Sequence, residues 1–322
     1  MKAFRAWPKR FELFAEIKKT DRFVTPEANR LVTPDLIRGP SFVAPWIPHP
    51  VRDDSPNMTT EQCITVNGTE VWRQGQGDEV ILMLHGWPDT RALWDGTVAA
   101  LQDRATCARL TLPGFEYGSA ATSLDDMCQL LRQIVDLISP DQPLTLMLHD
   151  WGCIFGYEFA MRHPDRVARV VAVDVGDHNS GSLLREWGLK EKLSVMGYQV
   201  WLALAWKLGG NLGTRMTRAM ARWLRCPTDP ASITHKMNYP YAMQWFSTAG
   251  GFKRAAQIQL PMPLLFVYGE RKPFMFHSVK WLKKVAANPG SSVQGLPCGH
   301  WVMVSKPEAF HARVRQWLWG EA

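Results

Sequence analysis

The chain lacks the features that would place it across a membrane or on nucleic acid. No stretch reaches the ~18 consecutive apolar residues of a membrane span, and the 37 Lys and Arg residues are not gathered into a basic stripe. A formal net charge of +7 over 322 residues is that of a mildly basic globular protein. The sequence therefore predicts no nucleic-acid partner and no integral membrane segment.

Cysteine pairs, metal-ligand spacings and phosphate loops are missing as well. None of the six cysteines forms a C-x-x-C pair, which is typical of free thiols in a reducing cytosol, so we expect a cytoplasmic protein. No His/Cys cluster has the spacing of a metal site. The run "GGNLG" at 209–213 does not follow a predicted strand, as a nucleotide-binding loop would. We expect no metal and no cofactor.

Residues 1–57 differ from the rest of the chain. They hold eight of the 22 prolines and show no sustained hydrophobic period. They also lack the apolar run of about 7–15 residues that marks a secretory signal. The phrase from "TPDLIRGP" to "VRDD" resembles the translation of a dispersed bacterial genomic repeat. We predict that these residues are poorly ordered and carry no chemistry, with Met58 as the true start. Whether they occur in the native protein is left open.

Beyond Met58, predicted strands alternate with predicted helices. Asn67-Gly68 joins two short alternating runs, a strong hairpin signal. Continuous apolar runs such as "EVILMLHG" indicate strands buried on both faces. Apolar positions 124, 127, 130, 131, 134, 135 and 138 have helical spacing. The pattern also predicts a strand at 144–149, a strand over "VARVVAVDV" and a last helix from about 307 to 319. This alternation predicts an α/β fold with a mainly parallel sheet flanked by helices.

The Trp-rich stretch 177–257 interrupts the alternation, and we interpret it as a helical lid inserted into the sheet domain. The core domain then comprises 58–176 and 258–322. The sequence does not indicate the oligomeric state.

Three predicted strands end in sharply punctuated motifs. These are "HGWPD" at 85–89, "HDWG" at 149–152 and "CGHW" at 298–301. Because the carboxyl ends of parallel strands face one crevice, the motifs are expected to converge. Their order and local sequences resemble the α/β-hydrolase fold, in particular its epoxide hydrolase and haloalkane dehalogenase branch. The resemblance covers about 60–320.

Asp150 is the candidate nucleophile at a tight strand-to-helix turn. The N-terminus of the following helix favours its ionised form, although an aspartate there could also be a simple helix cap. A carboxylate that attacks an sp3 carbon forms an ordinary ester, so Asp150 indicates displacement at an epoxide or a carbon–halogen bond. Leu148 departs from the small residue usual two positions earlier. Either the turn accommodates the larger side chain, or it is slightly opened.

His300 is the candidate base that activates water against this ester, and a base needs an acid to orient it. Many family members carry that acid at the position of Lys272. Others place it where Asp174 stands, so Asp174 is favoured, with Glu270 and Asp177 as alternatives.

The resemblance assigns the oxyanion hole to the backbone N–H groups of Trp87 and Trp151. Leaving-group support distinguishes the two branches. An alkoxide needs a proton donor, for which Tyr239 and Tyr241 are candidates. A halide needs N–H donors, and the candidate indoles are Trp187, Trp206 and Trp245.

His149 is expected to point away from the crevice, because alternate strand residues face opposite sides. We assign it no catalytic role.

The sequence thus predicts a hydrolase acting through a covalent aspartyl ester, most simply an epoxide hydrolase on an apolar substrate with water. The alternatives are a haloalkane dehalogenase and a member of the fold that binds small ligands without turnover. The substrate and its stereochemistry are left open.

Overall fold

The computed structural model describes residues 60–115, 120–178 and 180–321. The predictions made for residues 1–57 and Met58 lie outside these ranges. Among the helices described, none combines the length and hydropathy required to cross a membrane.

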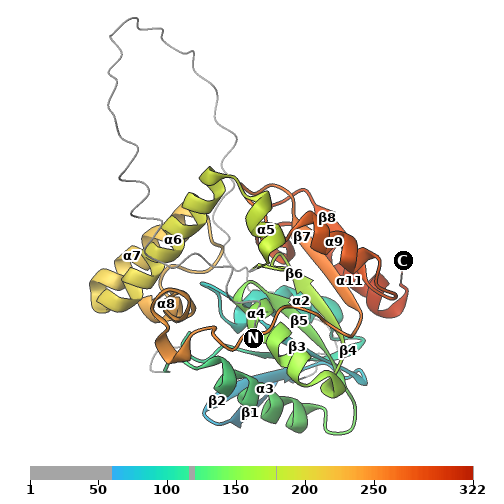
Figure 1. Ribbon diagram of the computed structural model, residues 1–322. Helices are drawn as coiled ribbons and strands as arrows, with labels where there is room; N and C mark the ends of the chain where they lie inside the picture. Colours follow the sequence, from blue (N-terminus) through green and yellow to red (C-terminus); the bar gives the residue numbers. More distant parts are fainter. Residues whose placement is uncertain (1–59, 116–119, 179, 322) are drawn as a thin grey trace, which may run out of the picture. The chain divides into compact units, whose positions relative to one another are not determined.

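A sheet of eight strands organises the described residues (Figure 1), in the order β1-β2-β4-β3-β5-β6-β7-β8. β2 pairs antiparallel with β1 and β4, and all other neighbours are parallel. The mainly parallel sheet that we predicted is therefore confirmed. The strands are β1 Gln62–Val66, β2 Thr69–Gln74, β3 Glu79–Leu84, β4 Ala105–Leu110, β5 Leu144–His149, β6 Val167–Val173, β7 Leu264–Gly269 and β8 Ser292–Leu296.

Helices connect these strands. The α-helices are α2 Asp95–Leu101, α3 Leu124–Ile138, α4 Trp151–Arg162, α5 Gly181–Glu186, α6 Leu189–Leu208, α7 Gly210–Trp223, α8 Tyr239–Phe246, α9 Val279–Ala286, α10 Val302–Ser305 and α11 Pro307–Trp319. Short 3-10 turns are η2 Arg91–Trp94, η3 Pro164–Arg166, η4 His235–Asn238 and η5 Thr248–Gly250.

Both faces of the sheet are covered. Leu82 and Leu84 of β3 belong to a hydrophobic cluster with α3, α4 and α9. Ile81 and Met83 belong to a second cluster with α2, α10 and α11. All four side chains are fully buried. A strand packed on both faces explains the continuous apolar run in the sequence.

Most elements follow the sequence pattern closely. Asn67 and Gly68 both have positive φ, 47° and 79°, as the predicted hairpin turn requires. Strand β5 and helix α11 have the predicted bounds. The strand predicted over "VARVVAVDV" instead ends at Val173, because Asp174 has a φ of 72° and leaves the ladder.

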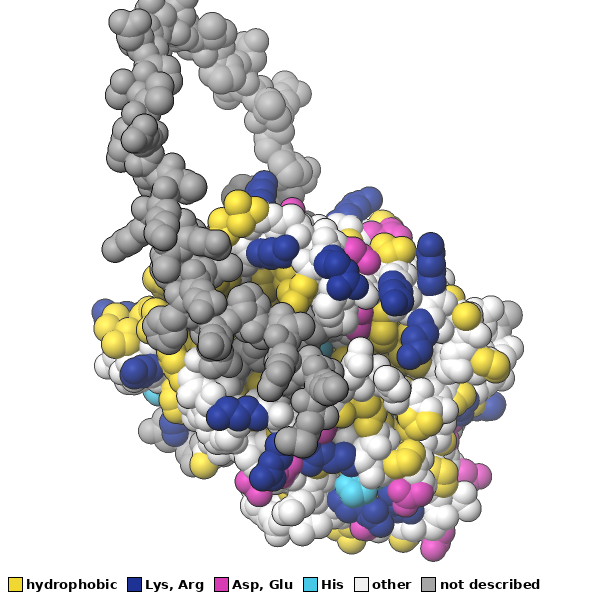
Figure 2. Space-filling model, viewed as in Figure 1, with side chains coloured by type: hydrophobic (Ala, Val, Ile, Leu, Met, Phe, Trp, Pro, Cys, Tyr) yellow, Lys and Arg dark blue, Asp and Glu magenta, His cyan; other side chains and the backbone are white. Residues whose placement is uncertain are grey.

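Helices α5 to α8 lie between β6 and β7 in the sequence. Helices α6, α7 and α8 form a group beside the sheet, whereas α5 lies next to α9 (Figure 1). Hydrophobic side chains are exposed over α6 and α7 (Figure 2). Leu208, Leu212 and Trp223 each expose more than half of their surface. The helical content predicted for this stretch is present, and its division from the core as a separate lid stays a prediction.

Candidate active site

Asp150 occupies the turn between β5 and α4. Its backbone angles are φ 52° and ψ −120°, a conformation that is strained for any residue with a side chain. The turn places the carboxylate at the carboxyl end of the central strands, beside the first turn of a helix. These are the features of a nucleophile elbow.

The elbow accommodates Leu148 by means of a glycine one turn into α4. Leu148 is fully buried, and its side chain occupies the space that a Cβ on Gly156 would need. The larger residue is therefore absorbed by the small one opposite it. Of the two arrangements that the sequence left open, the structure has this one.

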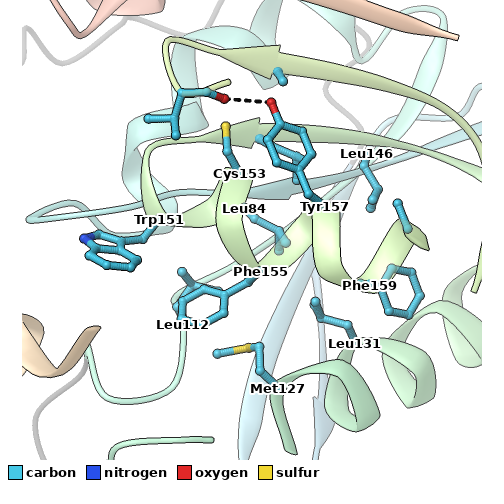
Figure 3. Packing of buried hydrophobic residues seen from close by; sticks show 14 of the residues in the cluster. Leu84, Leu112, Met127, Leu131, Leu146, Trp151, Cys153, Phe155, Tyr157 and Phe159 are labelled. Atoms are coloured by element: carbon cyan, nitrogen blue, oxygen red, sulfur yellow. Dashed lines mark hydrogen bonds between the residues drawn. The ribbon is translucent and has the colours of Figure 1, made fainter. Parts of the chain in front are cut away.

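Helix α4 also holds the neighbouring strand end in place (Figure 3). Its residues Phe155, Tyr157 and Phe159 lie in the core cluster. The Tyr157 hydroxyl donates a 2.7 Å hydrogen bond to the carbonyl of Val175. Val175 directly follows Asp174, so the elbow helix helps to fix the loop that carries the second carboxylate.

The loop after β3 supplies a hydrogen-bond donor to the elbow. The backbone N–H of Trp87 donates to Asp150 Oδ1 at 2.7 Å. A Cβ on Gly86 would collide with the Asp150 side chain, so only glycine permits this approach. His85 braces the loop: its Nε2 accepts from the N–H of Leu112 at 2.9 Å. Burial lowers the pKa of His85 to about 4, so this imidazole is neutral.

His300 links the two carboxylates. Its Nε2 lies 3.5 Å from Asp150 Oδ2, and its Nδ1 contacts Asp174 Oδ2 in a short hydrogen bond. The Asp150 and His300 side chains are each 16% exposed, whereas Asp174 is fully buried. The structure thus brings the three predicted residues together in a nucleophile–base–acid arrangement.

Asp174 is held by two further donors on its other oxygen. The N–H of Gly269 donates to Oδ1 at 2.9 Å, and the ammonium of Lys272 forms a short ion pair with the same atom. Burial alone would raise the pKa of the Asp174 carboxyl. The charges of Lys272 and His300 outweigh burial and hold this pKa well below its usual range.

The two alternative acids do not contact His300. Asp177 Oδ1 accepts from the N–H of Ser278, and Oδ2 accepts from its hydroxyl, each at 2.7 Å. Asp177 therefore serves the start of α9. Glu270 is exposed and lies against Gly295 of β8.

The charges around His300 determine its protonation. Burial alone would lower the pKa of His300, but the Asp174 and Asp150 carboxylates raise it to about 9. The pKa of Asp150 is lowered, because the hydrogen bond and charge of His300 outweigh the effect of burial. At neutral pH the resting site therefore contains an imidazolium between two carboxylates.

His149 lies closer to His300 than strand alternation predicted. The two rings have centroids 4.5 Å apart, and His149 Nε2 is 3.3 Å from the His300 carbonyl. The expectation that His149 points away from the site is therefore wrong, because the loop carrying His300 packs over the end of β5. Burial lowers the pKa of His149 to about 3, which keeps it neutral.

Another buried carboxylate, Asp89, lies next to His149. Asp89 Oδ2 accepts from the Trp301 indole at 3.0 Å, and Oδ1 accepts a short hydrogen bond from the Thr228 hydroxyl. Burial raises the pKa of Asp89 to about 6. Asp89 connects the loop after β3 to the segments that carry Thr228 and Trp301.

The two predicted tyrosines have different surroundings. The ring of Tyr241 lies edge-on to the indoles of Trp87 and Trp151, with ring centroids 5.9 Å and 5.1 Å apart. Burial and then the Asp150 charge raise its pKa. Tyr239 packs against Phe155 instead, and its buried hydroxyl has no hydrogen-bond partner among the described residues.

Sequence reasoning missed Tyr198 of α6. Its ring is 6.1 Å from Tyr241, and burial followed by the Asp150 charge raises its pKa. A tyrosine within the mostly apolar run "VMGYQVWLALAW" was the available signal.

Two of the three candidate indole donors already have acceptors. Trp187 Nε1 donates to the Met275 carbonyl at 3.0 Å, and Trp245 Nε1 donates to Gln199 at 3.2 Å. Trp206 is half-buried in the core cluster. The indole of Trp87 donates to Asn238 of η4 at 2.7 Å, which connects the loop after β3 to the segment between β6 and β7.

Comparisons with known proteins identify the family and the fold of the chain. A family model for the alpha/beta hydrolase fold matches residues 79–307. A crystal structure of a Bacillus megaterium epoxide hydrolase, 19% identical, has a TM-score of 0.59 and covers 80% of this chain and 99% of that one. A haloalkane dehalogenase variant from Bradyrhizobium elkanii, 17% identical, has a TM-score of 0.61 and covers 82% and 98%. These likenesses show the fold.

A curated relative, the probable oxidoreductase EphD of Mycobacterium tuberculosis, is 28% identical over 132 residues. The match covers 36% of this chain and 22% of that protein. The chain therefore spans about a fifth of this relative's length.

Proposed function

Since this chain belongs to the α/β-hydrolase family and is a hydrolase of that fold, we propose that it acts through an ester on Asp150. In this proposal it converts an apolar epoxide to a diol. One observation carries the proposal: Asp150 Oδ1 accepts from the Trp87 N–H, while Oδ2 lies 3.5 Å from His300 Nε2. One carboxylate oxygen is thus held by a donor, and the other faces the base.

In the first step, Asp150 Oδ2 attacks an epoxide carbon and the carbon–oxygen bond of the ring breaks. The alkoxide takes a proton from a tyrosine hydroxyl, for which Tyr241 and Tyr198 are the candidates. In the second step, His300 removes a proton from water, which attacks Cγ of Asp150. The charge that develops on Oδ1 is stabilised by the N–H groups of Trp87 and Trp151. The bond between Cγ and Oδ2 then breaks, the leaving substrate oxygen takes the proton of the new carboxyl group, and the diol leaves with His300 again protonated.

Esterification changes the protonation of the base. The resting pKa of His300 is about 9 partly because of the hydrogen bond and charge of Asp150. An ester at Asp150 carries no charge, so the pKa of His300 falls. The proton that His300 releases restores the tyrosine that gave its own proton to the alkoxide. The imidazole then becomes a base only when there is an ester to hydrolyse.

The surroundings of the elbow support an epoxide over a halide. Two tyrosine rings lie near Asp150, whereas the indoles of Trp187 and Trp245 are bonded elsewhere. The dehalogenase remains the second candidate because the Trp151 indole lies beside Tyr241, next to the nucleophile. Cytoplasmic localisation is part of the proposal.

Mass spectrometry of the His300→Gln variant tests the proposal. The variant is incubated with styrene oxide and, separately, with 1-bromobutane, and the peptide containing Asp150 is weighed. We expect the styrene oxide mass on Asp150, and no adduct in a His300→Gln/Asp150→Asn control. An adduct from 1-bromobutane alone would identify a dehalogenase. An adduct on another residue, or with neither probe, would count against the proposal and favour a ligand-binding member of the fold.

A further inference from the structure

Lys272 stands where many relatives carry the acid that orients the base, and it points its charge into the site. Its ammonium pairs with Asp174 Oδ1, and its side chain is only 7% exposed. A buried lysine charge is costly unless it is paired. The same carboxylate presents Oδ2 to His300, so the lysine and the histidine do not compete for one oxygen.

We propose that Lys272 is a positioning residue that balances the charge of Asp174, so that His300 loses its proton once Asp150 is esterified. This inference rests on the proposed ester mechanism and concerns the same site. The lysine at position 272, where the resembled family often has an acid, then helps to set the protonation of His300.

The argument follows from the charges at each stage. In the resting site, the negative charges of Asp150 and Asp174 balance the positive charges of His300 and Lys272. When Asp150 becomes an ester, these four groups lose one negative charge. A protonated His300 then leaves them with an excess positive charge, which the loss of its proton removes.

Without Lys272 the proton is held more strongly. An imidazolium beside Asp174 would then be a neutral pair after esterification, so the pKa of His300 would stay higher and a smaller fraction of His300 would be neutral at pH 7. An imidazolium cannot accept a proton from water. The lysine therefore keeps the base available in the second step.

Other titratable groups around this cluster do not replace Lys272. His149, which packs against the His300 ring, is neutral. The Asp89 charge acts on His300 whether or not the lysine is present. Against Lys272, His277 has a pKa lowered to about 4 by burial and then by the lysine charge. The Cys298 thiol has a raised pKa, mainly because it is buried.

Two more distant charges have opposite signs. Glu270 raises and Lys306 lowers the pKa of Cys298, and neither forms a hydrogen bond or ion pair with His300 or Asp174 among the described contacts. Lys272 is therefore the cation that contacts Asp174 beside the base.

The test is the titration of His300 in the resting protein, which needs no substrate. Full-length protein labelled with [15N]histidine is titrated by NMR, and the His300 signal is identified by its absence in His300→Gln. In Lys272→Gln, which keeps a hydrogen-bond donor and removes the charge, we expect the titration midpoint to rise by about one pH unit or more. Lys272→Arg, which keeps the charge, should titrate as the wild type does. An unchanged midpoint in a folded Lys272→Gln would overturn the proposal.

A second pair of variants covers the case in which Lys272→Gln fails to fold. Asp174→Asn and Asp174→Asn/Lys272→Met are compared, because removing the lysine there leaves no carboxylate unpaired. The double variant should titrate at higher pH than the single one, and equal midpoints would contradict the charge argument.

The kinetic counterpart separates this proposal from the ester mechanism. In Lys272→Gln the rate of ester hydrolysis at pH 7 should fall about tenfold and recover as the pH rises, with adduct formation little changed. If adducts form but the pH profile does not move, the lysine proposal fails alone. If no variant forms an adduct while the NMR midpoint shifts, the ester mechanism fails and the charge coupling stands.

Discussion

The Nε2 atom of His300 lies 3.5 Å from Oδ2 of Asp150, while its Nδ1 contacts Asp174. The imidazole is therefore placed between two carboxylates that it can neutralise as a cation. The same placement lets it reach a water molecule that attacks an ester at Asp150. Both the stability of the fold and the chemistry should depend on this imidazole.

The free energy of unfolding should fall as pH rises through the His300 titration. The pKa of His300 is about 9 in the folded protein, above its ordinary value near 6.5. A raised pKa stabilises the fold fully below the unfolded value, and that stability is lost as pH rises through the folded value. Between about pH 6.5 and 9.5 we expect a loss of roughly 3 kcal/mol relative to His300→Gln. Urea unfolding at a series of pH values measures it. Parallel pH curves for the two proteins would contradict the charge assignment.

Asp174→Asn should slow hydrolysis of the covalent intermediate and leave its formation largely intact. The asparagine removes the charge that orients and stabilises the imidazolium formed in the second step. Rapid-quench mass spectrometry should show the Asp150 adduct accumulating, with hydrolysis on the order of 100-fold slower. Glu270→Gln is the matched control, because Glu270 is exposed and does not contact His300. Wild-type hydrolysis in Asp174→Asn would show that another group orients the base.

Tyr241→Phe and Tyr239→Phe remove the same atom from two neighbouring positions. If the substrate is an epoxide, the loss at Tyr241 should slow adduct formation from styrene oxide by roughly 10- to 100-fold. The loss at Tyr239 should leave the rate unchanged, since its hydroxyl has no partner among the described residues and its ring packs against Phe155. The ratio of the two single-turnover rates decides the matter. A larger effect at Tyr239 would reverse the assignment.

Gly156→Ala should destabilise the elbow by about 1–3 kcal/mol, because the new methyl group meets Leu148 in a packed core. Gly197→Ala in α6 is the matched control. A Cβ there meets nothing within 4 Å, so this variant should gain about 0.5–1 kcal/mol. Urea unfolding compares the two. Equal stabilities would mean that Leu148 and Gly156 are not interlocked, whereas rescue of Gly156→Ala by Leu148→Ala would support it.

The sequence was sufficient for the parts of the site that lie at strand ends. Parallel strands deliver their carboxyl ends to one edge, so the motifs that carry Asp150 and His300 were expected to converge. Asp174 was favoured by the family resemblance, with Glu270 and Asp177 as alternatives. The hairpin turn and the bounds of β5 followed from short-range rules. In each case local chemistry and topology determine the position.

What could not be predicted depends on long-range packing. The face that α6 turns toward the elbow is set by its neighbours, so Tyr198 was not identified and Tyr239 was not separated from Tyr241. Leu148 packs against Gly156 in the next helix. No local pattern in the sequence shows that this glycine makes room for Leu148. The contact of Lys272 with Asp174 joins two loops. Loops have no regular hydrophobic periodicity from which such a contact could be predicted.

The most direct test of the central claim is a single turnover of styrene oxide in H2¹⁸O, with the enzyme in excess over the epoxide. Because water attacks Cγ of Asp150 and not the substrate, the label should enter the peptide containing Asp150, and the diol from the first turnover should be unlabelled. Label in that first diol with an unlabelled Asp150 would contradict the ester mechanism.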